Sequence, residues 1–283
     1  MPSDAPSEAS GLAGKEAAAA YAAYLRARRP VSWRNARRLI LAGLLLAFFT
    51  YCWRAARVDP ERLWHGLPKI GEWLVQAWPP ATGELPLLAE RTGETIAIAA
   101  MGTLAATLLA IPMAILASRN LTPSLALYYP ARAVLNLLRG IDSFVFALLF
   151  VAAVGLGPFA GAIGVGLHTW GSMAKLYADH IENADTGPME AIAATGTPRI
   201  AAIRFALLPD VLPVLLSTTL FWWEFNVRAS TVLGVVGAGG IGQELKNSLD
   251  LLDFQRLFTI IGFILVVVVV LDQLSNWARR RLG

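Results

Sequence analysis

The segment from Asp185 to Pro209 holds residues whose types and spacing suit a specific structural task. Gly187 and Pro188 predict the start of a helix, with Gly187 as the N-cap and Pro188 at the first helical position. Glu190 at the third position can bond back to the cap and interact with the positive end of the helix. These residue types favour the shaping of a short helix, not the transfer of protons or chemical groups.

A helix stop and a second helix start follow within the same segment. Gly196 predicts a left-handed turn, because glycine has no Cβ to clash in that conformation. Thr197 and Pro198 then predict a second helix, with Thr197 as its cap and Pro198 at its first position. Leu208-Pro209 closes the segment. Two helices meeting at an angle, with small residues on one face, would form a corner that a partner can approach closely. A capped connector between two membrane helices is the alternative.

A glycine-rich stretch further along carries a formal GxGxxG pattern. Its glycines are Gly237, Gly239, Gly240 and Gly242. A dinucleotide site would need a preceding strand, a following helix and an acidic residue about 20 positions on. Here the stretch lies between two apolar segments instead. We therefore expect a packing or gating role, with contact between its free amides and an anion as the alternative.

Three sets of ionisable residues lie in or beside apolar runs. An ionisable side chain at membrane depth is energetically costly, so each set is a candidate for a functional site. Glu224 and Arg228 are four apart and could pair at the outer end of a membrane helix, or Arg228 could meet an anionic substrate. Arg139 with Asp142, three apart, allows the same two interpretations. His168 lies inside a Gly-rich run and could bond a neighbouring helix or face a pathway.

The sequence gives no sign of a catalytic or metal centre. His65, His168 and His180 lie far apart in the chain, so their spacing predicts no metal site. No paired acids, His cluster or activated nucleophile stands within the apolar segments, which argues against a membrane-embedded enzyme. The chain has no GxxxxGKS/T loop, so we expect it to bind no ATP itself. Its one cysteine, Cys52, can form no internal disulfide.

The composition places these segments in a membrane protein. Of the 283 residues, 56% are hydrophobic and only 16% charged, with a mean hydropathy of +0.54, whereas a soluble domain carries about 25% charged residues. The net charge of +4 would suit nucleic acid in a soluble protein, but in a membrane chain it reflects Lys and Arg on cytoplasmic loops. An ordinary water-soluble enzyme, a disordered protein and a disulfide-stapled secreted domain are excluded.

Six apolar runs are candidates for membrane helices, each of which needs roughly 20 residues. They are Leu39–Trp53, Thr95–Ala117, Phe144–Gly157, Phe159–Tyr177, Leu207–Trp223 and Leu257–Leu271. The third and fourth are separated only at Gly157-Pro158. With the N-terminus inside, the cytoplasmic segments hold about twice as many Lys and Arg as the opposite side, so we expect both termini in the cytoplasm.

Three regions are expected along the chain. Residues 1–38 would be a cytoplasmic tail, either a helix near anionic headgroups or a partly disordered segment. Residues 39–90 would hold the first membrane helix and an outer loop, whose Trp and Leu spacing from Asp59 to Trp78 predicts an interfacial helix. Residues 91–283 would form the main transmembrane domain, with the cytoplasmic loop at residues 182–209. No internal repeat is visible, which argues against a carrier built from two similar halves.

The cytoplasmic loop resembles the signature of a known family. The pattern is EAA, three residues, G, nine residues, I, one residue, LP, and it marks inner-membrane permeases of bacterial ABC importers. Glu190-Ala191, Gly196 and Leu208-Pro209 match it, with departures at Ile192 and Ala206. Four further stretches resemble the branch that moves phosphonates and related phosphorus oxyanions: Val154–Gly161, Leu167–Trp170, Asn226–Leu245 and Leu271–Leu282. The resemblance covers roughly residues 90 to 283.

The resemblance implies an all-α, type I ABC importer permease fold with about six transmembrane helices, in the bacterial inner membrane. In this family the loop contains a coupling helix that docks on a separate ATPase. The coupling residues it implies are Glu190, Ala191, Ala194, Gly196, Thr197, Pro198, Arg199 and Pro209. The gate or pathway residues we infer are Glu224, Arg228, Gly237, Gly239, Gly240, Gly242, Arg139 and His168.

The implied partners are two ATP-binding cassette ATPase subunits, a periplasmic phosphonate-binding protein, a second copy of the chain and membrane lipid, with no nucleic acid. ATP and Mg would be bound by the ATPase subunits, so the chain would bind no cofactor and would not be an enzyme. Two alternatives stay open. The chain could be a permease for another small substrate, such as the amino acid methionine, or a gradient-driven secondary carrier.

Overall fold

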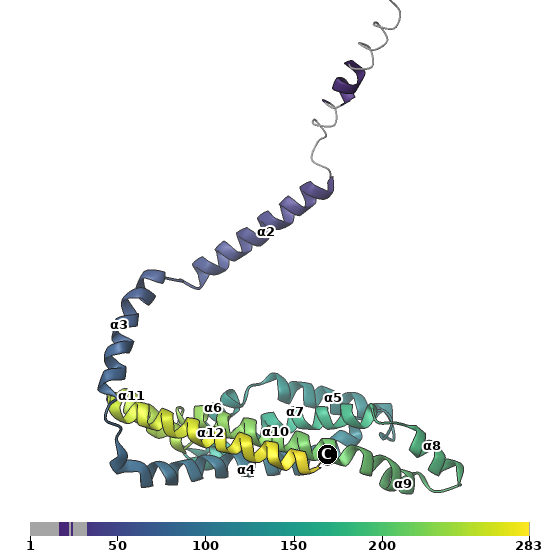
Figure 1. Cartoon of the computed structure of the whole chain (residues 1–283). Coiled ribbons are helices and arrows are strands. Elements are labelled where there is room, and N and C mark those ends of the chain that lie inside the picture. Colours follow the sequence, from purple (N-terminus) through teal and green to yellow (C-terminus); the bar gives the residue numbers. More distant parts are fainter. Residues whose placement is uncertain (1–16, 23, 25–32, 283) are drawn as a thin grey trace, which may run out of the picture. The chain divides into compact units, whose positions relative to one another are not determined.

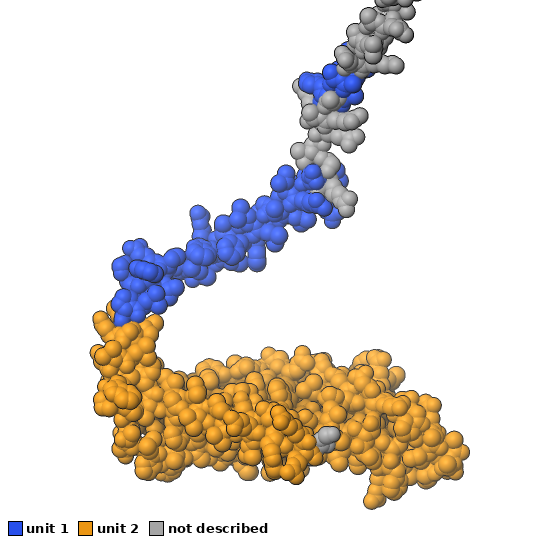
Figure 2. All heavy atoms as spheres, in the orientation of Figure 1, with its two compact units in different colours: residues 1–68 blue, residues 69–283 orange. Residues whose placement is uncertain are grey.

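The computed structural model describes residues 17–22, 24 and 33–282, and the regular secondary structure within these ranges is all helical. The predicted all-α fold is therefore confirmed for this part of the chain. Its contacts divide the chain into two units, residues 1–68 and residues 69–283 (Figure 2). Most of the predicted cytoplasmic tail, residues 1–38, lies outside the described residues.

The first unit contains an unpartnered apolar helix. In α2 (Trp33–Ala55) none of the described side chains is buried. A helix that is apolar all round is stable where lipid or another protein covers it, which agrees with the predicted first span. The start of α3 (Pro60–Gln76) is fixed by Asp59, whose carboxylate accepts from the backbone N–H of Glu61 and of Arg62, both at 3.1 Å. The helix predicted for the outer loop is thus present.

The second unit is a helical bundle in which α4, α7, α10 and α12 run side by side (Figure 1). Its elements are η1 (Thr82–Glu84), α4 (Leu85–Leu116), α5 (Leu125–Gly140), α6 (Ser143–Val154), α7 (Pro158–Glu182), α8 (Gly187–Ala194), α9 (Arg199–Ala202), η2 (Ile203–Leu207), α10 (Leu208–Gly234), α11 (Ile241–Asp250) and α12 (Phe254–Leu282). The central helix α7 packs against α4, α5, α6 and α10.

Small residues let α7 approach its neighbours closely. A Cβ atom added to Gly166 would lie 3.3 Å from the carbonyl oxygen of Gly102 on α4. One added to Gly164 would lie 2.7 Å from the backbone nitrogen of Ala147 on α6. Close backbone approach of this kind drives helix association in membranes, where lipid removes the hydrophobic driving force. The small residues of α7 therefore serve packing.

Four described helices are long and apolar enough to cross a membrane, or five if the bent pair of α5 and α6 is one span. The predicted third span, Phe144–Gly157, is wrong in extent. Helix α6 has 12 residues, too few to cross about 30 Å alone, and it meets α5 at a bend of 85°. The predicted fourth span, Phe159–Tyr177, corresponds to the 25-residue α7. That helix is less apolar than the others because much of it faces protein rather than lipid.

Three membrane helices extend well beyond their predicted ends. Helix α4 begins ten residues before the predicted Thr95, α10 continues to Gly234, and α12 continues to Leu282. The prediction stopped at charged residues, which are costly in hydrocarbon. In the structure several of these charges lie in ion pairs within the bundle, so the helices continue through them.

Candidate functional site

The first half of the predicted coupling loop is a short helix capped by an aspartate. The carboxylate of Asp185 accepts a hydrogen bond from Gly187 N at 2.9 Å, and α8 begins at Gly187 with Pro188 in its first turn. The prediction of Gly187 as the N-cap is therefore wrong by one residue, since Thr186 takes that position without a side-chain cap bond. Glu190 lies in the first turn, as expected, and is exposed.

The turn after α8 has the predicted left-handed conformation. Gly196 has φ +79°, and nothing lies within 4 Å of the position a Cβ would occupy. The predicted cap at Thr197 is wrong, because its hydroxyl contacts the hydroxyl of Thr195 at 2.5 Å instead. Pro198 takes the N-cap position with an extended ψ of 145°, so α9 begins at Arg199.

The second half of the loop is continuous with a membrane helix. Residues from Arg199 to Gly234 form one helix of 36 residues, made of α9, a π-helical turn at η2 and α10. The expectation that Leu208-Pro209 closes the segment is wrong, because the helix continues from the π-helical turn at η2 through Pro209 into α10. A local π-helical adjustment can satisfy the backbone groups that a proline frees in a membrane helix. A displacement of α9 therefore passes directly into α10.

The corner formed by α8 and α9 lies at the opposite end of the bundle from α11 (Figure 1). Six predicted coupling residues are exposed there: Glu190, Ala191, Ala194, Gly196, Pro198 and Arg199. Pro209, in the first turn of α10, is also exposed. Thr197 is half-buried. This arrangement leaves the corner accessible to a partner while α9 stays tied to the bundle.

The glycine-rich loop joins α10 to α11 and is packed inside the bundle. Gly237, Gly239 and Gly240 have φ values between +73° and +88°. The hydroxyl of Thr95 on α4 accepts from Ile241 N at 2.8 Å, and Gly157 N donates to the carbonyl of Gly237 at 2.9 Å. The loop follows a helix rather than the strand that a dinucleotide site requires. These contacts show that the loop is packed against α4 and the start of α7, and the gating role stays a prediction.

Gly242 lets the start of α11 lie directly on α10. A Cβ atom there would stand 1.8 Å from the carbonyl oxygen of Thr231 and 3.0 Å from Gly234 Cα. Contacts under 3.0 Å cannot be accommodated without moving backbone, so this position requires glycine.

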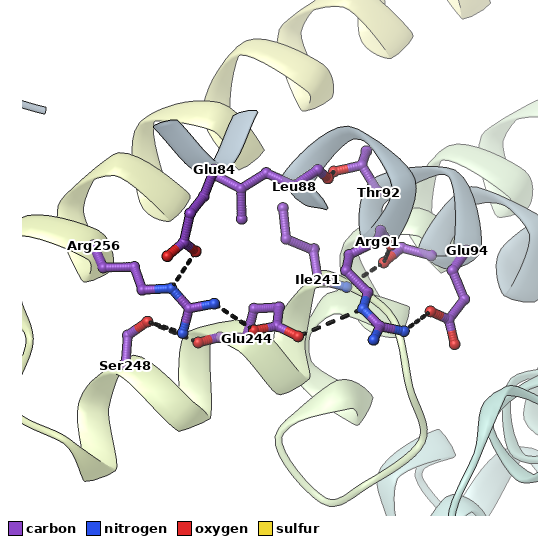
Figure 3. A network of polar contacts seen from close by, with 10 residues as sticks. Glu84, Leu88, Arg91, Thr92, Glu94, Ile241, Glu244, Ser248 and Arg256 are labelled. Carbon is purple, nitrogen blue, oxygen red and sulfur yellow. Dashed lines mark hydrogen bonds and ion pairs between the residues drawn. The ribbon is translucent and has the colours of Figure 1, made fainter. Parts of the chain in front are cut away.

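A network of ion pairs surrounds α11 at the same end of the bundle (Figure 3). Arg256 of α12 contacts Glu84 and Glu244, both at 2.7 Å. Arg91 of α4 contacts Glu94 at 2.9 Å and Glu244 at 3.5 Å. The Glu244 side chain is 11% exposed, so its charge is compensated mainly by these two arginines. The network links η1, α4, α11 and α12.

This network is not among the predicted sites. Its signal in the sequence is the presence of opposite charges at residues 84–94 and 244–256, directly before the predicted spans that begin at Thr95 and Leu257. Pairing between these stretches depends on how the helices pack, which the sequence pattern alone does not give. The network contains three carboxylates and two guanidinium groups, so it has no excess of positive charge to bind an anion. Its role is to hold the helices together.

The predicted pair of Glu224 and Arg228 is confirmed, with 3.0 Å between Arg228 Nη2 and Glu224 Oε1. Glu224 does not lie at the end of its helix, because α10 continues ten residues beyond it, and its predicted place at the outer end of a span stays a prediction. Arg279 of α12 also contacts Glu224, at 3.1 Å. The carboxylate is therefore an interior group held by two guanidinium groups. Arg228 keeps 45% of its side chain exposed.

The last two predicted pathway residues lie near the bend between α5 and α6. Among the described residues Arg139 forms no ion pair, and its expected partner Asp142 instead caps α6 by accepting from Phe144 N at 2.8 Å. Arg139 is exposed. His168 of α7 bonds through Nδ1 to the carbonyl oxygen of Ile141 at 2.8 Å. His168 therefore anchors this bend to α7, in agreement with the expectation that it bonds a neighbouring helix.

The described helices define a polytopic, all-helical membrane protein. One end of its bundle carries the exposed corner of α8 and α9, and the other end carries the packed glycine-rich loop. The family model of the binding-protein-dependent transport system inner membrane component matches residues 106–283. The chain belongs to this family. It is thus an inner-membrane permease subunit of a transport system, and the family implies ATPase and substrate-binding protein partners.

Individual relatives agree with this assignment. The chain is 42% identical over 246 residues to the putative phosphite transport system permease protein HtxC of Stutzerimonas stutzeri, covering 87% of each. It is 37% identical to the phosphate-import permease protein PhnE of Mycolicibacterium smegmatis, over 87% of this chain and 46% of that protein. A solved structure of the MetNI methionine ABC transporter in inward-facing conformations matches at TM-score 0.62 and 21% identity, over 72% of this chain and 99% of that one. That likeness establishes the type I importer fold.

Proposed function

We propose that this chain is the transmembrane subunit of an ATP-driven importer for a phosphorus oxyanion, with phosphonate, phosphite and phosphate as the candidate substrates. The substrate class is supported by the similarity to permeases named for phosphite and phosphate transport. The observation that carries the transport mechanism is the exposed corner of α8 and α9, whose second helix runs without a break into α10.

The corner would be the docking point for a separate ATPase. Gly196 sets its angle through a left-handed turn, and the exposed coupling residues around it would fill a groove on the partner. Closure of two ATPase subunits on ATP and Mg would move two such corners and switch the permease between inward-open and outward-open states. This chain would bind neither ATP nor Mg, so hydrolysis would belong to its partners.

The opposite end would form the gate. The loop from Gly237 to Gly240 lies between α10 and α11, and we propose that it opens and closes the pathway as α10 moves. The close contact of Gly242 with α10 and the ion pair between buried Glu224 and exposed Arg228 would keep this part of α10 rigid. Arg228 and Arg139 keep exposed guanidinium groups, which suit contact with an anion passing along the pathway.

The working unit would be two copies of the chain around one pathway. An apolar groove of about 440 Å³ runs between α4 and α7, and a second copy would cover it. Both termini would lie in the cytoplasm, on the side of the coupling corner. A periplasmic binding protein for phosphonate or a related oxyanion would deliver the substrate at the gate.

Uptake by cells that express the chain with its ATPase and binding protein tests this function. We expect ATPase-dependent uptake of a labelled phosphonate or phosphite, competed by phosphorus oxyanions and not by methionine. Uptake competed by methionine alone would make the chain an amino-acid permease. Uptake that survives inactivation of the ATPase and stops when the ion gradient collapses would make it a secondary carrier.

A further inference from the structure

Arg132 of α5 joins the ends of α4 and α7. Its Nε donates to the carbonyl oxygen of Ala117, the residue that ends α4, at 2.9 Å. Its Nη1 donates to Asp179 Oδ1 at 2.8 Å, and its Nη2 lies 2.9 Å from Glu182 Oε2 as an ion pair. The guanidinium also lies over the ring of Tyr128, 5.4 Å from its centroid. The side chain is only 17% exposed, so these contacts form mostly away from solvent.

The turn between α4 and α5 connects this cluster to the coupling corner. Arg119 N donates to Glu182 Oε1 at 2.8 Å, so Glu182 holds both Arg132 and this turn. The next residue, Asn120, donates through Nδ2 to the carbonyl of Ile181 at 2.7 Å. Its own carbonyl accepts a hydrogen bond from the guanidinium of Arg199, the first residue of α9. Asn120 is therefore held between the end of α7 and the start of α9.

A second arginine, Arg119 in the turn between α4 and α5, also contacts Tyr128. Arg119 Nε donates to the hydroxyl of Tyr128 at 3.2 Å, and its guanidinium lies 5.3 Å from the same ring centroid. This hydrogen bond raises the pKa of Arg119 above its usual value. Tyr128 itself is buried, and its ring contacts Arg119 and Arg132 together. The turn thus has contacts to α5, α7 and α9.

We propose that Arg132 is a positioning residue for energy coupling. It holds the ends of α4 and α7 together as one rigid unit. A displacement of α9 is then transmitted to both helices through Arg199 and Asn120. This inference rests on the proposed function. Without Arg132, the carboxylates of Asp179 and Glu182 would repel each other, since they are three residues apart on α7. The carbonyl of Ala117 would also lose its donor. The turn that contains Asn120 would then shift when α9 moves and would not transmit the movement to α4 and α7.

Lysine cannot take over this role. The three contacts to Ala117, Asp179 and Glu182 use three nitrogens of one planar guanidinium, whereas an ammonium is a compact charge without that fork. Arg132→Lys therefore separates charge from geometry. It keeps the positive charge between two carboxylates but breaks the three-way connection.

The measured quantity is substrate transported per ATP hydrolysed, because a residue that serves stability alone changes the amount of folded complex and not this ratio. The complex of two permease copies, ATPase and binding protein is reconstituted in vesicles with Arg132→Met, Arg132→Lys or Glu182→Gln. Lys175→Met is the matched control. Lys175 also connects α7 to α5, through an exposed hydrogen bond to Asn136 Oδ1 at 3.3 Å, but among the described residues its side chain forms no hydrogen bond or ion pair with α4 or the corner.

We expect the ATPase to bind all variants. The ratio should fall at least about fivefold in Arg132→Met and less in Arg132→Lys and Glu182→Gln, and stay at the wild-type value in Lys175→Met. If Arg132→Met does not yield a folded complex, Arg132→Lys and Glu182→Gln decide the question. A wild-type ratio in the folded Arg132 and Glu182 variants would overturn the inference and leave the proposed function intact. A wild-type chain that binds no ATPase would overturn both.

Discussion

Arg279, near the end of α12, donates a hydrogen bond at 3.1 Å to Glu224 in the interior of α10. The same carboxylate accepts from Arg228 at 3.0 Å, and the Glu224 side chain is 10% exposed. One buried acid therefore ties the C-terminal helix to the helix that continues into the coupling corner. Because charges inside a membrane protein are costly unless paired, the buried carboxylate depends on these two arginines, and Arg228 also contacts Asp272 at 3.7 Å.

Glu224→Gln should destabilise the bundle, because it leaves Arg279, whose side chain is 24% exposed, without its carboxylate partner. Arg228 is half exposed and keeps Asp272 at 3.7 Å, so the loss falls mainly on Arg279. Removing one partner of a buried ion pair costs about 3 kcal/mol or more. Thermal unfolding in detergent, followed by tryptophan fluorescence, measures the effect. Glu90→Gln, at an exposed carboxylate of α4, should change stability by less than about 0.5 kcal/mol. Equal unfolding temperatures for both variants would contradict this assignment.

Gly242→Ala should prevent α11 from seating on α10. Its Cβ would meet the carbonyl oxygen of Thr231 at 1.8 Å, and relief of that clash requires backbone movement costing about 3 kcal/mol or more. We expect loss of folded protein by size-exclusion chromatography in detergent. Gly262→Ala is the control, because nothing lies within 4 Å of its added Cβ. Wild-type yield and stability for Gly242→Ala would contradict the close packing of α11 on α10 at this position.

The pair of Glu244 and Arg256 should show strong energetic coupling, since both side chains are largely buried and 2.7 Å apart. In a double-mutant cycle of Glu244→Gln and Arg256→Gln, we expect an interaction energy of about 2 kcal/mol. The exposed pair of Lys246 and Asp250, also 2.8 Å apart, should give less than about 1 kcal/mol. Additive effects at the first pair would mean that the ion network does not hold α11 in place.

Local features of the fold could be predicted from the sequence because they depend on few neighbouring residues. The left-handed turn at Gly196 and the pair of Glu224 with Arg228 are of this kind, since each is decided within four residues. The contact between Glu224 and Arg279 was missed because its partners are 55 residues apart. Only the packing of α10 on α12 brings them together.

Helix ends were less predictable because several neighbouring polar residues can stabilise a helix start. The start of α8 shifted by one residue, with Thr186 at the N-cap position and the Asp185 carboxylate accepting from Gly187 N. The continuous helix from Arg199 to Gly234 contains Pro209, which the sequence pattern assigns to a boundary. The π-helical turn Ile203–Leu207 precedes this proline, and such local adjustments let a membrane helix continue through proline. The sequence pattern does not reveal that turn.

The central claim is that the corner around Gly196 docks a separate ATPase, and co-purification tests it most directly. The tagged chain is isolated in mild detergent as wild type, Gly196→Arg and Gly196→Asn, and the bound ATPase is quantified. Arginine is strained at φ +79° and adds a long charge at the exposed turn, whereas asparagine tolerates this conformation. We predict a stoichiometric ATPase with the wild type and Gly196→Asn, and its loss with folded Gly196→Arg. Full ATPase binding by Gly196→Arg, or none by the wild type, would contradict the account.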